Sequence, residues 1–241
     1  MKISKLFFSV MIALLAVTDA RAQRPKTFWI AATAGVNTSL IINQNAYGNG
    51  ELDYATTLGL TAGPGVRYFF SDKWGINSSL NWARLGQNYR GLQSGSLATR
   101  KVNLDYIAFH LLAMRRITRA AQPTWIAFGP EIMYLTAAKQ EYHREAGNLL
   151  PGAEFLIEGN TDIKNRFRPV DFALNFSLNR MFDVLENRRI MLLITSNIAY
   201  GLTDISRSEW NIPNMHGKYA GSHNFYMGIS AGFMFNTSRR H

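Results

Sequence analysis

A histidine and a glutamate, His110 and Glu131, are the residues of this chain whose types and spacing could support acid–base chemistry. Each lies in a stretch where side chains alternate in character, the pattern typical of a β-strand. If 119–122 forms the turn between the two stretches, the pairing register places His110 directly opposite Glu131 on one face of a sheet. A histidine beside a carboxylate is two thirds of a hydrolase triad or, alternatively, a structural cross-strand pair.

The missing part of a triad is a nucleophile with a reason to be activated. Ser79 and Ser177 fall on inward faces, but nothing in their spacing singles them out. The remaining histidines are dispersed without metal-ligand spacing, the chain has no cysteine, and no phosphate-binding glycine loop occurs. We therefore expect a structural pair in a protein that is not an enzyme, with no catalytic residue, no cofactor and no metal site.

Alternation with a period of two places this pair on strands. It is clearest from 224 to 235, and it returns in 170–178 and 190–200. These runs are longer than a usual soluble strand and long enough for a tilted strand to cross a membrane. Eight strands are predicted in all, at 27–42, 53–70, 74–90, 101–118, 124–140, 166–182, 189–202 and 223–235.

Short and long connections alternate between these strands. The short ones are 71–73, 119–123 and 183–188, and the long ones are 43–52, 91–100, 141–165 and 203–222. An even number of strands, with tight turns at one end and long loops at the other, is the pattern of outer-membrane barrels. The sequence thus predicts an all-β fold, an eight-stranded antiparallel up-and-down transmembrane β-barrel whose N-terminus is periplasmic and whose long loops are extracellular.

The N-terminus reads as a secretory signal peptide, residues 1–22. Lys2 and Lys5 flank the start of an apolar run, and Ala20-Arg21-Ala22 forms a small-x-small cleavage site. The barrel domain is then 23–241. Removal of the signal peptide lowers the net charge from +10 to +8. A secreted chain does not suit a nucleic-acid role, and we expect arginines at the short turns to contact lipid phosphates, with a solvated rim or an acidic periplasmic partner as the alternatives.

Aromatic side chains gather at the strand ends predicted to be periplasmic. There they are expected to form a girdle at the membrane interface. Its members are Trp29, Tyr68, Trp74, Trp125 and Phe235. Several tyrosines, Tyr226 among them, are assigned to the opposite rim.

The lumen of the predicted barrel is narrow. Eight strands enclose an interior just wide enough for side chains to fill, so we expect a packed polar core and no wide aqueous pore. Asp171 and Arg67 also face inward on their strands. We expect them to join His110 and Glu131 in a network that satisfies buried charge.

Five segments, taken in order and spacing, carry a family resemblance. They are Gly35-Val36-Asn37, Phe70-Ser71-Asp72-Lys73-Trp74-Gly75, Phe128-Gly129-Pro130, Tyr200-Gly201-Leu202-Thr203-Asp204-Ile205 and Gly232-Phe233-Met234-Phe235. Together they resemble the PorT-like outer-membrane β-barrel family of Bacteroidetes-type bacteria, over essentially the whole mature chain. The resemblance implies an outer-membrane location, and some members of the family serve in the type IX secretion apparatus. Many barrels end on a terminal Phe, whereas here six residues follow Phe235.

Three classes of function remain. The favoured class is a structural or interaction protein, including an accessory of a type IX-like secretion apparatus, because the 141–165 segment mixes charge with an apolar patch and suits protein contact. A narrow transport conduit is the alternative, followed by a lipid-modifying enzyme. The expected partners are outer-membrane lipid and a periplasmic or surface protein, with no nucleic acid, and the barrel is monomeric or part of a larger complex.

Overall fold

The computed structural model describes residues 26–43, 52–93, 96–118, 122–145, 158–184, 189–211 and 219–237. The predicted signal peptide, 1–22, lies outside these residues. Within them the chain forms one antiparallel β-sheet and two single-turn 3-10 helices, η2 (Lys164–Arg166) and η3 (Ser208–Trp210). None of the helices in this described part is long and apolar enough to cross a membrane.

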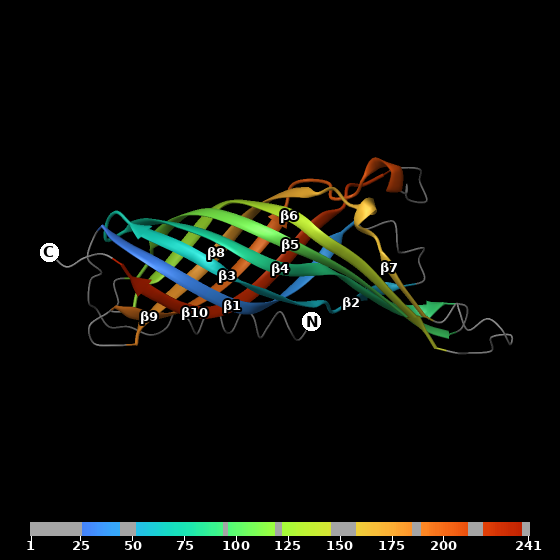
Figure 1. The fold of residues 1–241 in the computed structure, drawn as a ribbon, viewed down its shortest axis with the longest axis horizontal. Coiled ribbons are helices and arrows are strands. Elements are labelled where there is room, and N and C mark those ends of the chain that lie inside the picture. Colours follow the sequence, from blue (N-terminus) through green and yellow to red (C-terminus); the bar gives the residue numbers. More distant parts are fainter. Residues whose placement is uncertain are drawn as a thin grey trace.

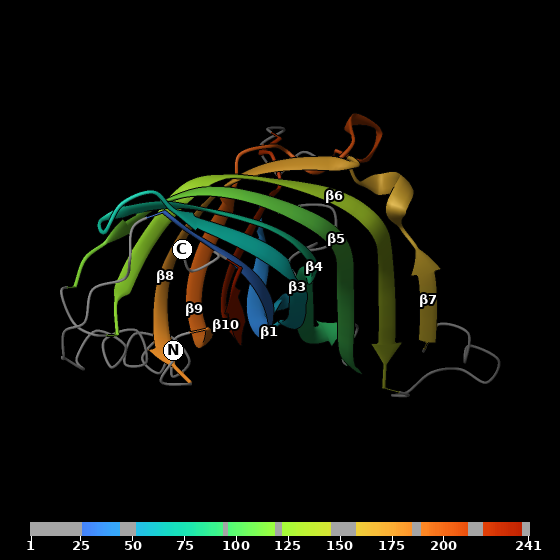
Figure 2. The ribbon, with the colours of Figure 1, turned by 60° about the vertical axis from the view of Figure 1, so that its left-hand side comes forward.

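Long strands form the wall of the fold. They are β1 (Thr27–Ile42), β3 (Leu58–Phe69), β4 (Trp74–Gln93), β5 (Ser96–Arg116), β6 (Thr124–Arg144), β8 (Val170–Asp183), β9 (Ile190–Gly201) and β10 (His223–Asn236). Each pairs with the next long strand along the chain, and β1 pairs with β10 as well as with β3, so the sheet closes into a barrel (Figures 1 and 2). The predicted all-β antiparallel barrel is confirmed.

Two short strands lie outside this ring. β2 (Asp53–Ala55) pairs with β4, and β7 (Glu158–Asp162) pairs with β6. The predicted strand 53–70 is therefore two strands, because 56–57 leave the ladder and the Thr57 hydroxyl instead accepts a hydrogen bond from the backbone N–H of Asn88.

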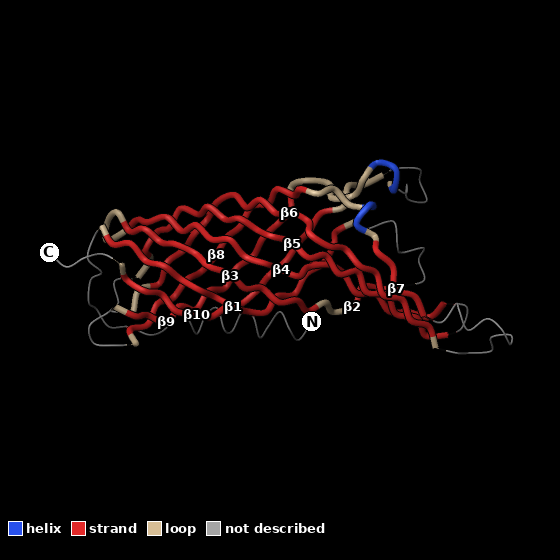
Figure 3. Tube along the Cα trace, viewed as in Figure 1, coloured by secondary structure: helices blue, strands red, loops and turns tan. Residues whose placement is uncertain are grey.

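The barrel has two different ends, which Figure 3 shows in the colours of the secondary structure. The short-turn end holds the start of β1, the end of β10 and the connections after β3, β5 and β8. The long-loop end holds the other connections.

Strand alternation sorts the residues onto an outer and an inner face. On β6, Phe128, Ile132 and Tyr134 are exposed, whereas Glu131 and Met133 between them are buried. Similar exposed apolar residues occur on the outer faces of the other strands, including Val36, Leu60, Leu80, Phe109, Phe176 and Phe233. A continuous apolar belt of this kind is stable where lipid covers it.

The belt ends at one level on three neighbouring strands. The outward-facing register partners Arg84 and Asp105 form an ion pair at 2.8 Å there. The outer faces of 74–82 on β4 and 126–134 on β6 lie on the short-turn side of this level, and each segment is nine residues long. A tilted strand needs about 9–11 residues to cross a bilayer, so the membrane boundary lies near the Arg84–Asp105 pair.

Beyond this boundary a flange of sheet projects from the barrel (Figure 1). The flange consists of 84–93 of β4, 96–105 of β5 and 136–144 of β6, with β2 and β7 at its edges. The predicted loops 91–100 and 141–165 were therefore wrong in part, because both contain strand residues. The inner face of these strands carries buried apolar side chains, among them Leu85, Val102 and Leu104, whereas the outer face is mostly polar.

Two irregularities mark the junction of barrel and flange. Gly86 has φ +134°, and a Cβ there would lie 1.9 Å from the Val102 carbonyl oxygen, so only glycine fits. The register of β5 against β6 shifts between Asp105 and Tyr106. Such bulges at the rim of a barrel bend the strands away from the wall.

Apolar side chains fill both ends of the lumen. The short-turn plug consists of Trp29, Ala31, Phe69, Leu112, Met114, Trp125, Ala127, Met181, Met191, Leu193 and Met234. The long-loop plug includes Ile41, Leu85, Leu104, Tyr106, Met133, Leu135, Ile163, Phe167 and Ile205. The expected polar core is thus wrong in part, because apolar side chains fill much of the lumen towards both ends.

The predicted aromatic girdle needs correction at two positions. Tyr68, Trp74 and Phe235 are exposed on the outer face near the short-turn end. Trp29 and Trp125 are 3% and 0% exposed and lie in the short-turn plug. Their strands alternate, so a tryptophan next to an outward-facing residue must point into the lumen.

Candidate functional site: a polar layer in the lumen

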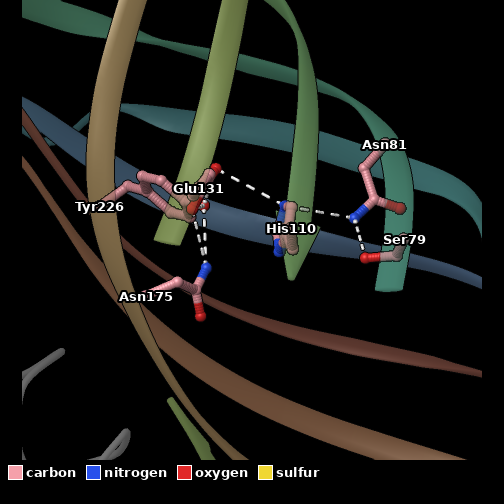
Figure 4. A network of polar contacts seen from close by, with 6 residues as sticks. All are labelled: Ser79, Asn81, His110, Glu131, Asn175 and Tyr226. Atoms are coloured by element: carbon pink, nitrogen blue, oxygen red, sulfur yellow. Dashed lines mark hydrogen bonds and ion pairs between the residues drawn. The ribbon is translucent and has the colours of Figure 1, made fainter. Parts of the chain in front are cut away.

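A polar layer separates the two plugs. It consists of Ser79 and Asn81 on β4, His110 on β5, Glu131 on β6, Asn175 on β8 and Tyr226 on β10 (Figure 4). On β5 the inward neighbours of His110 are Ala108 and Leu112, which belong to the long-loop plug and the short-turn plug. The six side chains therefore form a thin polar layer with apolar side chains on either side.

Glu131 is the most enclosed member of this layer, with 1% of its surface exposed. The Tyr226 hydroxyl lies 2.7 Å from each carboxylate oxygen. The Asn175 side-chain amide donates to Oε2 at 2.8 Å. A buried carboxylate is stabilised when donors reach its oxygens, and here Tyr226 reaches both oxygens from β10 and Asn175 reaches one from the neighbouring strand β8 (Figure 4).

His110 contacts the other side of the same carboxylate. The register pairs it with Glu131 on one neighbouring strand, as the sequence predicts, and with Ser79 on the other. Its Nε2 lies 3.5 Å from Glu131 Oε1 and 3.5 Å from the Asn81 amide nitrogen. The contact with Glu131 is longer than that of Tyr226, so Tyr226 and Asn175 are the principal partners of Glu131.

The row Ser79, His110 and Glu131 on adjacent strands invites comparison with a catalytic triad. In a triad one ring nitrogen faces the acid and the other faces the nucleophile. Here Nε2 faces both Glu131 and Asn81, and the Ser79 hydroxyl accepts a hydrogen bond from Asn81 at 3.3 Å. This geometry does not prepare Ser79 for attack.

Asp171 forms a second polar group, nearer the long-loop end. It is 1% exposed, and the Asn224 amide donates to its Oδ2 at 2.9 Å. The same amide nitrogen lies 3.1 Å from the Tyr106 hydroxyl. In the described residues, no cluster of three or more His, Asp or Glu side chains is placed to hold a metal ion.

Arg67 forms a third group, nearer the short-turn end. Its Nη2 donates to Asn179 Oδ1 at 2.8 Å, and that oxygen also accepts a hydrogen bond from Thr195. Arg67 makes no ion pair with Glu131 or Asp171, all three of which are described residues. The expected single network is therefore three separate groups, because the charged residues sit at different depths in the lumen.

Tyr226 is the residue of the layer that sequence reasoning misplaced. It was assigned to the membrane rim, yet it is 6% exposed and faces the lumen. A signal was present, because Tyr226 alternates in register with Asn224 and Gly228, whose types suit an inner face.

A folded cap covers the mouth at the long-loop end. It consists of 163–168, 203–211 and 219–222, and it contributes Ile163, Phe167 and Ile205 to the long-loop plug. The Asp204 carboxylate holds it together, accepting hydrogen bonds from the Tyr219 hydroxyl and from the backbone N–H groups of Ser206 and Ser222. Burial raises the pKa of Tyr219, and its hydrogen bond to Asp204 raises it further.

A closed antiparallel barrel with an apolar outer belt and a filled lumen defines the class of small membrane β-barrels. The chain belongs to the outer membrane protein beta-barrel domain family, whose family model matches residues 21–207. It is therefore a barrel protein of the outer membrane of a Gram-negative bacterium. No curated protein matches the sequence.

Several solved structures resemble this chain at low similarity. OprG from Pseudomonas aeruginosa has a TM-score of 0.45 and 12% identity, covering 92% of this chain and 100% of that one. Ail of Yersinia pestis has a TM-score of 0.40 and 13% identity, covering 88% and 100%. Neisserial surface protein A has a TM-score of 0.40 and 10% identity, covering 86% and 96%.

Proposed function

We propose that this protein is a structural or interaction barrel that acts through its long-loop end and not through its lumen. One observation carries the proposal: two apolar plugs fill the ends of the lumen, and a flange of sheet projects from the barrel. The plugs occupy the lumen on both sides of the polar layer. They oppose a transport conduit, because a hydrated solute would have to cross two dry barriers.

The flange offers a polar surface for a protein partner. Lys101 and Glu141 form an exposed ion pair at 3.6 Å on its outer face. An open groove of about 380 Å³ lies beside them, with Thr99, His143 and Asn160 in its lining. Charged and hydrogen-bonding groups of this kind contribute more to the specificity of a protein contact than to its affinity.

The orientation belongs to the same proposal. Barrels of this class have short periplasmic turns and longer external loops. We therefore place the N-terminus in the periplasm and the flange and cap outside the cell. The resemblance to PorT-like barrels adds a finer role, as an accessory of a type IX-like secretion apparatus, for which the partner would be a surface or periplasmic component of that apparatus.

A lipid-modifying enzyme is the less favoured function. Its catalytic row would be Ser79, His110 and Glu131, which the barrel wall separates from the surrounding lipid. The contacts of His110 also differ from those of a triad, because its Nε2 faces Glu131 and Asn81 and not Ser79.

The orientation can be tested because the chain has no cysteine. Single variants Lys101→Cys on the flange and Asp72→Cys at the short-turn end provide a matched pair of exposed sites. A membrane-impermeant maleimide should label Lys101→Cys on intact cells and should label Asp72→Cys only after the outer membrane is opened. The reverse pattern would refute the orientation.

The interaction role needs a separate experiment. A photo-crosslinking residue at Lys101 should give one protein adduct of fixed mass in living cells, and one at His143 should give the same adduct. Placed at Phe109, which lies on the lipid-facing part of the same strand as Lys101, it should give none. Adducts that are absent from both flange positions, or equally abundant at Phe109, would overturn the interaction role.

A further inference from the structure

A cavity of about 70 Å³ lies in the lumen beside the polar layer. Arg67, Asn37 and Asn77 contribute polar groups to its lining, and His110 borders it on another strand. Gly65 also lines the cavity, and a Cβ at that position would lie 3.0 Å from the Ser79 Cβ. A side chain at Gly65 would therefore press on Ser79 and reduce the space.

Arg67 is the cation of this cavity. It is 4% exposed, and only its Nη2 has a hydrogen-bond partner, the Asn179 amide oxygen. Its Nε and Nη1 are buried and reach no acceptor in the described protein. A guanidinium has five N–H donors and stays protonated, so several donors remain directed at no protein group.

The carboxylates of the lumen do not balance this charge. Glu131 is bonded to Tyr226 and Asn175, and Asp171 is bonded to Asn224. Neither lies within the 4.0 Å of Arg67 that an ion pair requires. A buried charge is costly unless it is paired, which favours an anionic ligand beside the guanidinium.

We propose that this cavity binds a small inorganic anion of the size of chloride or bromide, held by Nε and Nη1 of Arg67. A cavity of this volume admits a monatomic anion together with water, and the apolar plugs separate it from lipid headgroups. The inference is independent of the proposed function, because it concerns the sealed interior and not the flange.

The plugs determine how the test is done. Since apolar side chains close both ends of the lumen, an anion must enter while the barrel folds or during a rare opening. The protein is therefore refolded into detergent in sodium bromide or in sodium gluconate, at one ionic strength and without chloride. Gluconate is an organic anion much larger than bromide and serves as the reference anion.

The first measurement is direct. Crystals of the wild-type protein refolded in bromide should show an anomalous difference peak at hydrogen-bond distance from Nε or Nη1 of Arg67. Water alone gives no anomalous peak there. A map without a bromide peak at Arg67, at a resolution that shows the side chain, would overturn the proposal.

The second measurement uses variants. The thermal midpoint of the wild-type barrel should rise with the logarithm of bromide concentration, as expected for a ligand of the folded state. Arg67→Gln should lose this dependence, whereas Arg84→Gln, which removes an exposed arginine on the outer face, should retain it. An equal response to bromide in wild type and Arg67→Gln would mean that the effect does not arise at this cavity. If Arg67→Gln does not fold, the wild-type anomalous map decides.

Discussion

The Tyr226 hydroxyl lies 2.7 Å from both carboxylate oxygens of Glu131, although the two residues are 95 positions apart in the chain. Tyr226 is on β10 and Glu131 on β6, so the contact crosses the lumen (Figure 4). The strands β8 and β9 lie between β6 and β10 in the sheet, so the contact forms only when the sheet curls around the lumen. The contact therefore links a buried carboxylate to the curvature of the barrel.

Removal of this hydroxyl tests the strength of the contact. Tyr226→Phe should lower the free energy of unfolding in detergent by about 1.5–3 kcal/mol, the range for a hydrogen bond to a charged group. His110→Gln should cost less, since its Nε2 is 3.5 Å from the carboxylate. A larger loss for the His110 variant would show that the histidine is the main partner of Glu131.

Substitutions of Glu131 separate packing from hydrogen bonding. Glu131→Gln preserves the shape and one acceptor for the Tyr226 hydroxyl. Glu131→Leu leaves the donors of Tyr226 and Asn175 without an acceptor, and it should cost about 1–3 kcal/mol more of unfolding free energy. Chemical denaturation of the refolded barrel measures both variants. Equal stability of the two would contradict the polar layer as a structural device.

A charge on the outer face tests the position of the membrane. Phe128 is 54% exposed on the lipid-facing side of β6, and Phe128→Arg should cost about 2–4 kcal/mol in lipid if the site is near the bilayer midplane. Asn103→Arg, on the outer face of β5 within the flange, is the control and should change stability by less than about 0.5 kcal/mol. Similar effects at the two positions would place the flange in the membrane or Phe128 outside it.

Much of the fold could be predicted because its determinants are local. Alternation identified the long strands, and the tight turn between β5 and β6 was sufficient to predict the pairing of His110 with Glu131. The flange could be found only in part in this way. Alternation predicts its strands to residue 90, from residue 101 and to residue 140, whereas the strand residues 91–93, 96–100 and 141–144 fall in predicted loops.

Contacts across the lumen could not be predicted from hairpin registers. The bond between Arg67 and Asn179 joins residues 112 positions apart, and it depends on the tilt and stagger that appear only when the barrel closes. The inward tryptophans are a different case. Alternation along β1 and β6 implies that Trp29 and Trp125 face the lumen, whereas their place at strand ends favours the membrane interface. The two signals conflict, and the buried tryptophans follow the alternation.

The cap should open in alkali before the barrel unfolds. Because the pKa of Tyr219 is raised in the folded state, its contribution to stability is complete below the ordinary tyrosine pKa of about 10 and is lost as pH rises through the raised value. Cleavage within 203–211 by an alkaline protease should therefore accelerate above about pH 10. Tyr219→Phe cannot ionise and should show a weaker acceleration, and identical pH profiles would exclude Tyr219 as the cause.

The sealed lumen is the central claim, and electrical conductance tests it most directly. Wild-type barrel reconstituted into planar bilayers, beside an open porin as a positive control, should insert without a steady conductance. Trp125→Gly should stay closed as well, since the long-loop plug, with Met133 and Leu135 fully buried, remains in place. A stable, ohmic conductance of the wild-type protein, altered in size by Trp125→Gly, would show that the lumen is an open path and would contradict this account.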